Sequence, residues 1–202
     1  MYNFKWYEIG DENPFNKRIL DCRSYTQNMI STTKNRMIIE TFTNLRSSSG
    51  KEYVSKTIEN CKVIDTNLIY AHNGTHLEGS CFKAKSMEEK WDIYVYDNYF
   101  YFVKSWTGEL IFKAFAKICE SQILINQIEF NEYKSKDISL IDNNVHFLMM
   151  THAIKKIFPH KVPHNLKTDL EIATYSFAEF GNKCWYATFD NILDTTVKTI
   201  NK

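Results

Sequence analysis

The strongest constraint on the fold is a run of alternating aromatic and β-branched residues near the middle of the chain. Two such segments, residues 91–96 and 99–105, flank the dipeptide Asp97-Asn98. A dipeptide of this kind between two alternating segments is typical of the two-residue turn that closes a β-hairpin. We therefore predict a hairpin here, within an antiparallel β-meander at about residues 91–130.

The register of this hairpin sorts its side chains onto two faces of different chemistry. If Ile93 pairs with Phe102, one face is wholly apolar. The predicted apolar face carries Trp91, Ile93, Val95, Phe100 and Phe102. The opposite face is formed largely by tyrosines, whose rings favour burial while their hydroxyl groups favour water. We call this second face the tyrosine face; its members are Tyr94, Tyr96, Tyr99 and Tyr101.

The length of the next turn determines on which face of the sheet Lys113 lies. A three-residue loop, Trp106-Thr107-Gly108 with a left-handed glycine, places Lys113 on the tyrosine face and Leu110 on the apolar face. A loop of two residues would bury the same lysine in the core. Because register follows burial, we predict the longer loop, followed by a fourth strand over residues 123–130.

The segments on either side of the meander predict further helices and strands. The ranges are a helix at 34–45 and a strand at 62–71 before it, then helices at 139–157 and 168–180 and a strand at 185–189. We expect Pro159 and Gly181 to end the two later helices. A block of strands with helices around it indicates an α+β fold, an antiparallel sheet with helices packed against it. We predict that residues 1–202 form a single domain.

Composition argues against several classes of protein. The formal net charge is +1, and only four of the 25 basic residues are arginines, which makes a nucleic-acid partner unlikely. The chain has no apolar run long enough to span a membrane and no signal peptide at its first residues, so we expect no membrane association. The five cysteines are far apart and form no CxxC motif, which predicts reduced thiols and a cytoplasmic protein.

Metal and cofactor motifs are absent from the sequence. Two histidine pairs, His72/His76 and His160/His164, have the i, i+4 spacing that would place both rings on one face of a helix. Turn-forming residues, among them Pro163, interrupt both pairs. We therefore expect exposed loop histidines, no metal and no cofactor.

Two further groups could carry chemistry. Glu88, Glu89 and Asp92 could act as acid and base if one were buried, but charged side chains are seldom buried, so we expect a solvated turn. Cys22 is the best candidate nucleophile, because the neighbouring Arg23 would favour its thiolate. An isolated cysteine is more often a packing residue, and that alternative stays open.

Two hypotheses for the function follow. The first is a cytoplasmic protein-binding module, such as a small neutralising or immunity-type inhibitor, since tyrosines are enriched in protein interfaces. Its binding residues would be Tyr94, Tyr96, Tyr99, Tyr101 and Lys113, unless helices cover the tyrosine face internally. The alternative is a small enzyme or ligand-binding domain for a nucleotide-like or phosphorylated small molecule. Its site would be lined by Arg18, Cys22, Arg23 and Arg36. Catalysis is thus left open, although the missing motifs argue against it.

Overall fold

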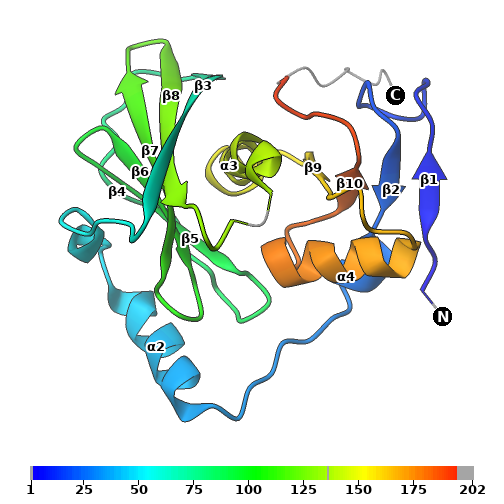
Figure 1. The fold of residues 1–202 in the computed structure, drawn as a ribbon, viewed down its shortest axis with the longest axis horizontal. Coiled ribbons are helices and arrows are strands. Elements are labelled where there is room, and N and C mark those ends of the chain that lie inside the picture. The colour runs from blue at the N-terminus through cyan, green and yellow to red at the C-terminus, as the bar shows by residue number, and fades with distance from the viewer. Residues whose placement is uncertain (1, 136, 195–202) are drawn as a thin grey trace. The chain divides into compact units, whose positions relative to one another are not determined.

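The computed structural model describes residues 2–135 and 137–194. The chain forms two compact units, one of residues 1–30 and 143–202 and one of residues 31–142. Each unit holds one sheet in which antiparallel pairing dominates, so the fold class is α+β, as predicted (Figure 1). The assignment of residues 1–202 to a single domain stays a prediction.

The unit of residues 31–142 is built on a six-stranded antiparallel sheet with the order β3-β8-β7-β6-β5-β4. Its strands are β3 (Cys61–Ala71), β4 (Gly79–Phe82), β5 (Trp91–Tyr96), β6 (Tyr99–Lys104), β7 (Leu110–Ile118) and β8 (Gln122–Asn131). Strands β5 to β8 pair in sequence order, which confirms the predicted meander. The strand predicted at residues 62–71 is also present, as β3.

The predicted register of the first hairpin is confirmed. Ile93 pairs with Phe102. Asp97 and Asn98 have φ angles of 51° and 63°, the left-handed values that a tight hairpin turn requires at both positions. The apolar face is buried, each of its members being at most 2% exposed: Trp91, Ile93, Val95, Phe100 and Phe102.

The turn between β6 and β7 is one residue longer than predicted. The Lys104 N–H donates to the carbonyl oxygen of Glu109 at 2.9 Å, so the loop runs from Ser105 to Gly108. Gly108 has the predicted left-handed conformation, with φ of 67°. A β-bulge further along offsets the extra residue, so Lys113 still lies on the tyrosine face.

The bulge changes the position of one side chain. Leu110 pairs with Val103 and packs against the buried part of the tyrosine face. Our prediction that Leu110 lies on the apolar face was therefore wrong. A bulge shifts the alternation of side chains without leaving a mark in the hydrophobic pattern.

Part of the tyrosine face is covered within the same unit. The predicted helix is present as α2 (Arg36–Ser47), and Asn35 begins it by accepting a hydrogen bond from the Met37 N–H at 3.0 Å. A short 3₁₀ helix, η1 (Lys51–Tyr53), follows. The ring of Tyr53 stacks on that of Tyr94, with centroids 5.6 Å apart and an interplanar angle of 20°. These contacts make a second buried cluster: Tyr53, Tyr94, Tyr96, Tyr101 and Val103.

The other unit is built on a four-stranded sheet with the order β1-β2-β10-β9. Its strands are β1 (Lys5–Tyr7), β2 (Ile19–Asp21), β9 (Pro159–Lys161) and β10 (Tyr186–Thr188). The first three in this order pair antiparallel, and β9 runs parallel to β10. Strand β10 is the late strand that the sequence predicted.

The remaining helices are α1 (Arg23–Thr26), the 3₁₀ helix η2 (Ile138–Leu140), α3 (Ile141–Leu148), the π-helix η3 (Met149–Ala153) and α4 (Asp169–Phe180). Of these, η2 and the first two residues of α3 belong to the unit of residues 31–142. Helix α4 confirms the prediction, because Thr168 and Glu171 form a capping box at its start and Gly181 follows its end. Helices α1 and α4 pack around a core of Leu20, Cys22, Tyr25, Val162, Ile172, Ala173, Phe177 and Ala187.

The helix predicted over residues 139–157 ends early. The π-helix closes at Ala153, and Lys155 takes a left-handed φ of 63°, which ends the helical path. Pro159 begins β9 and does not cap a helix. Among residues 2–135 and 137–194, no helix is long and apolar enough to cross a membrane.

Candidate functional site

The tyrosines predicted to bind a partner are mostly buried. Tyr94, Tyr96 and Tyr101 are 0%, 6% and 1% exposed. Helices α2 and η1, with the residues between them, form the covering segment of this face. The Tyr96 hydroxyl donates to the carbonyl oxygen of Ser49 at 2.8 Å, which ties the covering segment to the sheet. The Tyr94 hydroxyl is buried, and burial raises its pKa. In this conformation these three side chains serve as packing, and their use by a partner stays a prediction.

Two predicted binding residues remain partly accessible. Tyr99 is half-buried, and the Lys113 ammonium lies 4.3 Å from the centroid of its ring. The same ammonium is 3.9 Å from a carboxylate oxygen of Glu129 on the adjacent strand. These residues belong to the part of the tyrosine face, over β6 to β8, that lies outside the buried cluster.

The covering segment is anchored by a buried ion pair. Arg46 on α2 makes two hydrogen bonds to the carboxylate of Asp92 on β5, which is completely buried. The Arg46 guanidinium also donates to the carbonyl of Ala84. Our expectation that Asp92 and Glu89 form a solvated turn was wrong for both, since Glu89 is only 6% exposed. A carboxylate can be buried when a cation and N–H groups satisfy it.

The arginines of the alternative ligand site each have a carboxylate partner. The pairs are Arg18–Glu8, Arg23–Asp21 and Arg36–Glu40, with closest N–O distances of 2.7, 2.6 and 2.7 Å. Arg36 belongs to the unit of residues 31–142, while Arg18 and Arg23 belong to the other. Pairing neutralises their charges, which leaves these guanidinium groups little attraction for a phosphate.

Cys22 is in an environment that disfavours a nucleophile. Its side chain is buried, with Sγ 3.7 Å from the Leu20 carbonyl oxygen and 3.9 Å from the Ser176 hydroxyl. Burial raises the pKa of this thiol to about 12, so the thiolate is scarce at neutral pH. The geometry supports the packing role.

His160 is a further polar side chain in the same core, and it contacts Ser176, the residue that also contacts Cys22. Its Nε2 atom is 2.8 Å from the hydroxyl oxygen of Ser176. The side chain is fully buried, so our expectation of an exposed loop histidine was wrong, because β9 pairs with β10 and draws this residue inside. Burial lowers the pKa of His160 to about 3 and keeps the ring neutral.

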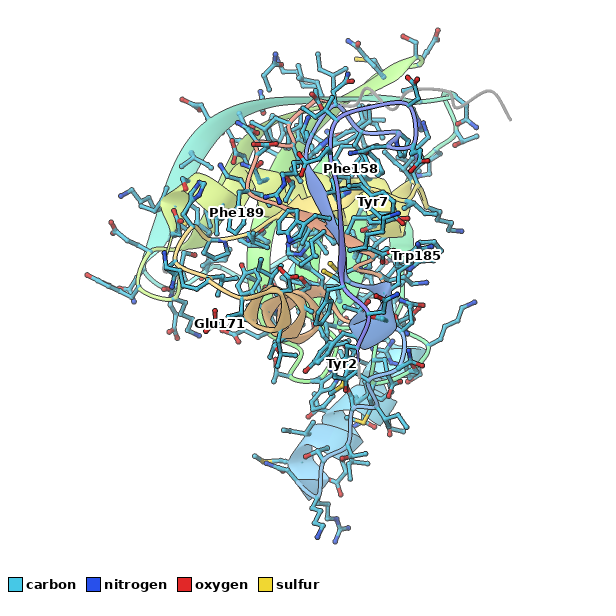
Figure 2. The ribbon with its side chains drawn as sticks, turned by 90° about the vertical axis from the view of Figure 1, so that its right-hand side faces the viewer. Tyr2, Tyr7, Phe158, Glu171, Trp185 and Phe189 are labelled. Carbon is cyan, nitrogen blue, oxygen red and sulfur yellow. The ribbon has the colours of Figure 1, made fainter. Side chains whose placement is uncertain are left out.

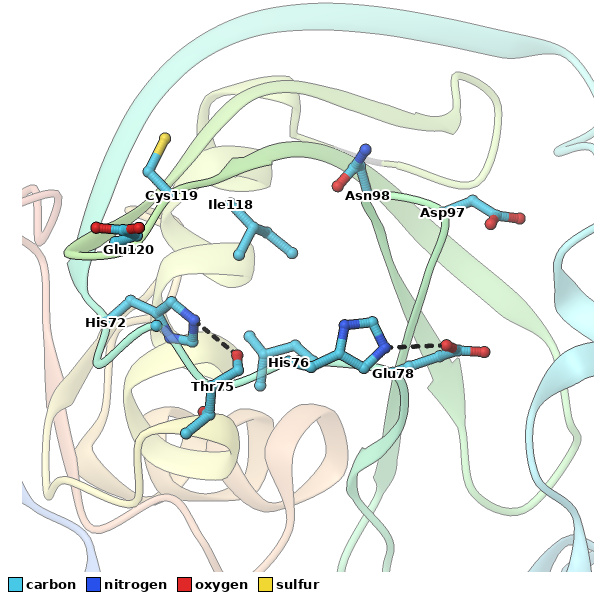
Figure 3. A pocket seen from close by; sticks show the side chains of 11 residues that line it. His72, Thr75, His76, Glu78, Asp97, Asn98, Ile118, Cys119 and Glu120 are labelled. Carbon is cyan, nitrogen blue, oxygen red and sulfur yellow. Dashed lines mark hydrogen bonds and ion pairs between the residues drawn. The ribbon is translucent and has the colours of Figure 1, made fainter.

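The unit of residues 31–142 has a polar pocket of about 480 Å³, formed by three connections at one end of the six-stranded sheet (Figure 3). It is lined by His72, Gly74, Thr75, His76, Leu77, Glu78, Asp97, Asn98, Ile118, Cys119 and Glu120. His76 Nε2 lies 3.1 Å from a Glu78 carboxylate oxygen, and His72 Nε2 lies 3.0 Å from the Thr75 carbonyl oxygen. The described part of the chain groups no three histidine, cysteine or acidic side chains so as to hold a metal. Sequence reasoning missed this pocket, because three loops distant in sequence build it.

The six-stranded sheet also has a long edge. Strand β3 is eleven residues long, stands first in the strand order, and pairs only with β8 among the described residues. Its alternate residues are exposed, including Val63 at 50% and Ile69 at 47%. Asp65 and Asn67 lie exposed between them. The sequence predicted this strand but contained no signal for its edge position, which depends on the order of strands.

Comparisons with known proteins give no relative: no family model matches the chain, and no curated protein or solved structure is significantly similar to it. The fold defines its class as an α+β protein with two separate sheets. Function is therefore inferred from the surfaces and pockets of the molecule itself.

Proposed function

We propose that this protein is a protein-binding module in which β3 receives an extended segment of a partner as an additional strand. The observation that carries the proposal is the position of this eleven-residue strand at the edge of the sheet, with no strand on its outer side among residues 2–135 and 137–194. An edge strand presents a row of main-chain donors and acceptors that another chain can pair with. Strand addition of this kind is an established mode of peptide recognition.

The exposed side chains of β3 define what kind of segment would fit. Val63 and Ile69 supply two apolar contacts about 20 Å apart along the strand, and Asp65 and Asn67 lie between them. In strand addition, main-chain hydrogen bonds give affinity and alternate side chains give specificity. The partner segment would therefore carry apolar residues near both ends and polar or basic residues in the middle.

The cellular setting belongs to the same proposal. All five cysteines are free thiols, which supports a reducing compartment such as the cytoplasm. A role as an inhibitor of the partner is consistent with a small binding module. Tyr99 and Lys113, the partly accessible residues of the tyrosine face, would widen the contact made by the β3 edge.

The test compares two double variants of the same unit. V63K/I69K places lysines on the β3 edge, where they oppose strand pairing. M37K/V54K is the matched control, because Met37 and Val54 are also exposed, at 73% and 36%, but lie off the edge. Both variants should keep the wild-type free energy of unfolding within about 0.5 kcal/mol, since surface changes cost little.

The experiment measures which proteins retain the partner and where on the chain the partner binds. Wild type and the control should retain the same partner from an extract of the native cells, and V63K/I69K should lose it. In the purified complex, hydrogen exchange of the β3 amides should slow, because the partner strand would bond to them. Equal capture by all three proteins, together with unchanged exchange in β3, would overturn the proposal.

Self-association is a separate outcome of the same experiment. If the bound segment is β3 of a second copy, wild type and control should sediment as dimers and V63K/I69K as a monomer.

A further inference from the structure

The polar pocket at one end of the six-stranded sheet has the size of a small-molecule site. Its volume of about 480 Å³ lies within the range of about 300–1,000 Å³ that is usual for ligand pockets. Three connections form its walls: residues 72–78 between β3 and β4, residues 97–98 between β5 and β6, and residues 118–120 at the end of β7. All three belong to the unit of residues 31–142, so one unit builds the pocket.

Main-chain contacts hold two of these walls together. The His72 N–H donates to the carbonyl oxygen of Ser121 at 2.9 Å. Gly74 has a left-handed φ of 76°, and a Cβ atom at this position would lie 3.3 Å from the carbonyl oxygen of Glu120. The connection after β3 therefore approaches the turn after β7 closely. A pocket whose walls are fixed in this way loses little conformational freedom when a ligand enters it.

The lining of the pocket is negatively charged. The described part of the chain contributes three acidic residues to it and no lysine or arginine. These residues, Glu78, Asp97 and Glu120, are all exposed, so a ligand can reach them. Glu78 contacts the ring of His76 at 3.1 Å, whereas Asp97 and Glu120 form no ion pair with any described residue. A ligand with positive charges would be attracted to these carboxylates.

The carboxylates lie at two separate ends of the pocket. Figure 3 shows Glu120 at one end, and Asp97 and Glu78 at the other. The apolar side chain of Ile118 lies between the two ends. A molecule with a cationic group at each end and an aliphatic chain between them matches this arrangement. A metal ion matches it less well, because the described residues form no group of three ligands for one.

Two aromatic rings of the other unit, those of Tyr7 and Trp185, are poorer sites for such a cation (Figure 2). The faces of aromatic rings attract ammonium groups. However, the Lys5 ammonium already lies 4.4 Å from the ring centroid of Tyr7, and the Arg23 guanidinium lies 5.9 Å from that of Trp185. A second cation at either ring would be repelled by the first. The polar pocket, which has no cationic side chain in its described lining, is the better site.

We propose that the polar pocket binds an aliphatic diamine. One ammonium group contacts Glu120, the other contacts Asp97 and Glu78, and the aliphatic chain packs against Ile118 and Leu77. Both ammonium groups donate hydrogen bonds to ionised carboxylates, which are stronger than hydrogen bonds between neutral groups. The inference does not rest on strand addition at β3, because none of the lining residues belongs to that strand.

The experiment is a titration of the full chain with cadaverine, an unbranched diamine, followed by ¹H–¹⁵N NMR. The amides of residues 72–78, 97–98 and 118–120 should shift with saturation, with Kd on the order of 1 mM. Pentylamine has the same number of carbon atoms but a single ammonium group, so it should bind about threefold more weakly. A tenfold increase in salt should weaken the binding of cadaverine, because salt screens charges that are exposed.

Two double variants of the same unit locate the site. D97N/E120Q removes one carboxylate from each end, and asparagine suits the left-handed φ of 51° at position 97. It should weaken the binding of cadaverine about tenfold. E40Q/E59Q changes the net charge equally at exposed positions outside the pocket and should bind as wild type does. A native-like spectrum shows that each variant is folded.

Three outcomes would overturn the proposal. The first is a wild type that shows no saturable shift up to roughly 10 mM cadaverine. The second is equal binding of cadaverine and pentylamine by wild type, a comparison that does not depend on the folding of any variant. The third is equal binding of cadaverine by the two double variants.

Discussion

Arg46 and Asp92 form an ion pair in which Nη2 lies 2.5 Å from Oδ2 and the carboxylate is fully buried. Arg46 is near the end of α2 and Asp92 is on β5, so the pair joins the covering helix to the sheet. Lys83 reinforces the junction, since its ammonium donates to the carbonyls of Arg46 and Ser48 at 2.8 and 2.6 Å. The Lys83 ammonium thus lies against the carbonyl groups at the C-terminal end of α2, a position where the helix dipole stabilises a cation.

Replacing Arg46 with Met should destabilise the protein by about 3–5 kcal/mol, because it leaves the Asp92 carboxylate buried without its cation. The comparison is Arg36→Met on the same helix, whose partner Glu40 is exposed. That change should cost less than about 0.5 kcal/mol. Urea unfolding of both variants measures the difference, and equal free energies would contradict the anchoring role.

Gly50 should not tolerate a side chain. Its φ is 85°, and a Cβ atom there would overlap the ring of Tyr94. Gly50→Ala should therefore lower the free energy of unfolding by about 2–4 kcal/mol, from left-handed strain and overpacking together. Gly10→Ala is the matched control, because nothing lies within 4 Å of a Cβ at that position. Thermal melts of the two variants test this directly; a Gly50 variant as stable as the Gly10 variant would show that the segment does not pack on the sheet.

Truncation to alanine should distinguish the buried tyrosines of the tyrosine face from an exposed tyrosine that lies outside it. Tyr94→Ala and Tyr101→Ala should each cost about 3–5 kcal/mol of stability, since both side chains are at most 1% exposed. Tyr133→Ala, at a side chain that is 79% exposed, should cost less than about 0.5 kcal/mol. If Tyr94→Ala instead leaves the melting temperature unchanged, the covering segment opens readily and this face becomes available for a partner.

Acid should destabilise the unit that contains His160. The pKa of this ring is about 3 in the folded chain and about 6.5 when unfolded, so between these values the unfolded state binds more protons. Stability is therefore complete above pH 6.5 and falls as the pH drops toward 3. Between pH 7 and pH 5 the loss from His160 should be about 2 kcal/mol.

His160→Gln removes this titration and keeps a side chain that can hydrogen-bond to Ser176. Its loss of stability between pH 7 and pH 5, measured by urea unfolding, should be smaller than that of wild type by about 2 kcal/mol. His76→Gln, at an exposed ring in the other unit, is the control for the substitution itself. Identical slopes for His160→Gln and wild type would mean that His160 becomes protonated without unfolding.

The meander could be predicted because its information is local. Alternating side chains over β5 and β6, with Asp97-Asn98 between them, determine both the turn and the pairing of Ile93 with Phe102. The information that predicts helix α4 is equally local, since Thr168 marks the start of the helix and Gly181 its end. In each case a few neighbouring residues contain the whole signal.

The sites could not be predicted in this way. Asp92 looks like a solvated carboxylate until Arg46 is placed against it, and His160 looks like a loop residue until β9 pairs with β10. Burial of a polar group depends on partners that are distant in sequence, because only those partners can offset the loss of water. The same holds for the polar pocket at one end of the six-stranded sheet, which combines His72 with Asn98 and Glu120.

The sequence by itself determined the α+β class, the register of the central hairpin, and the presence of α2 and α4, since period and capping are properties of contiguous residues. Tertiary structure decided that the tyrosine face is largely covered, that β3 is an edge, and that His76, Asn98 and Glu120 share a pocket. Exposure is a property of the assembled surface. A tyrosine on a strand is accessible or buried according to whether another segment packs on it, and no local pattern records that choice.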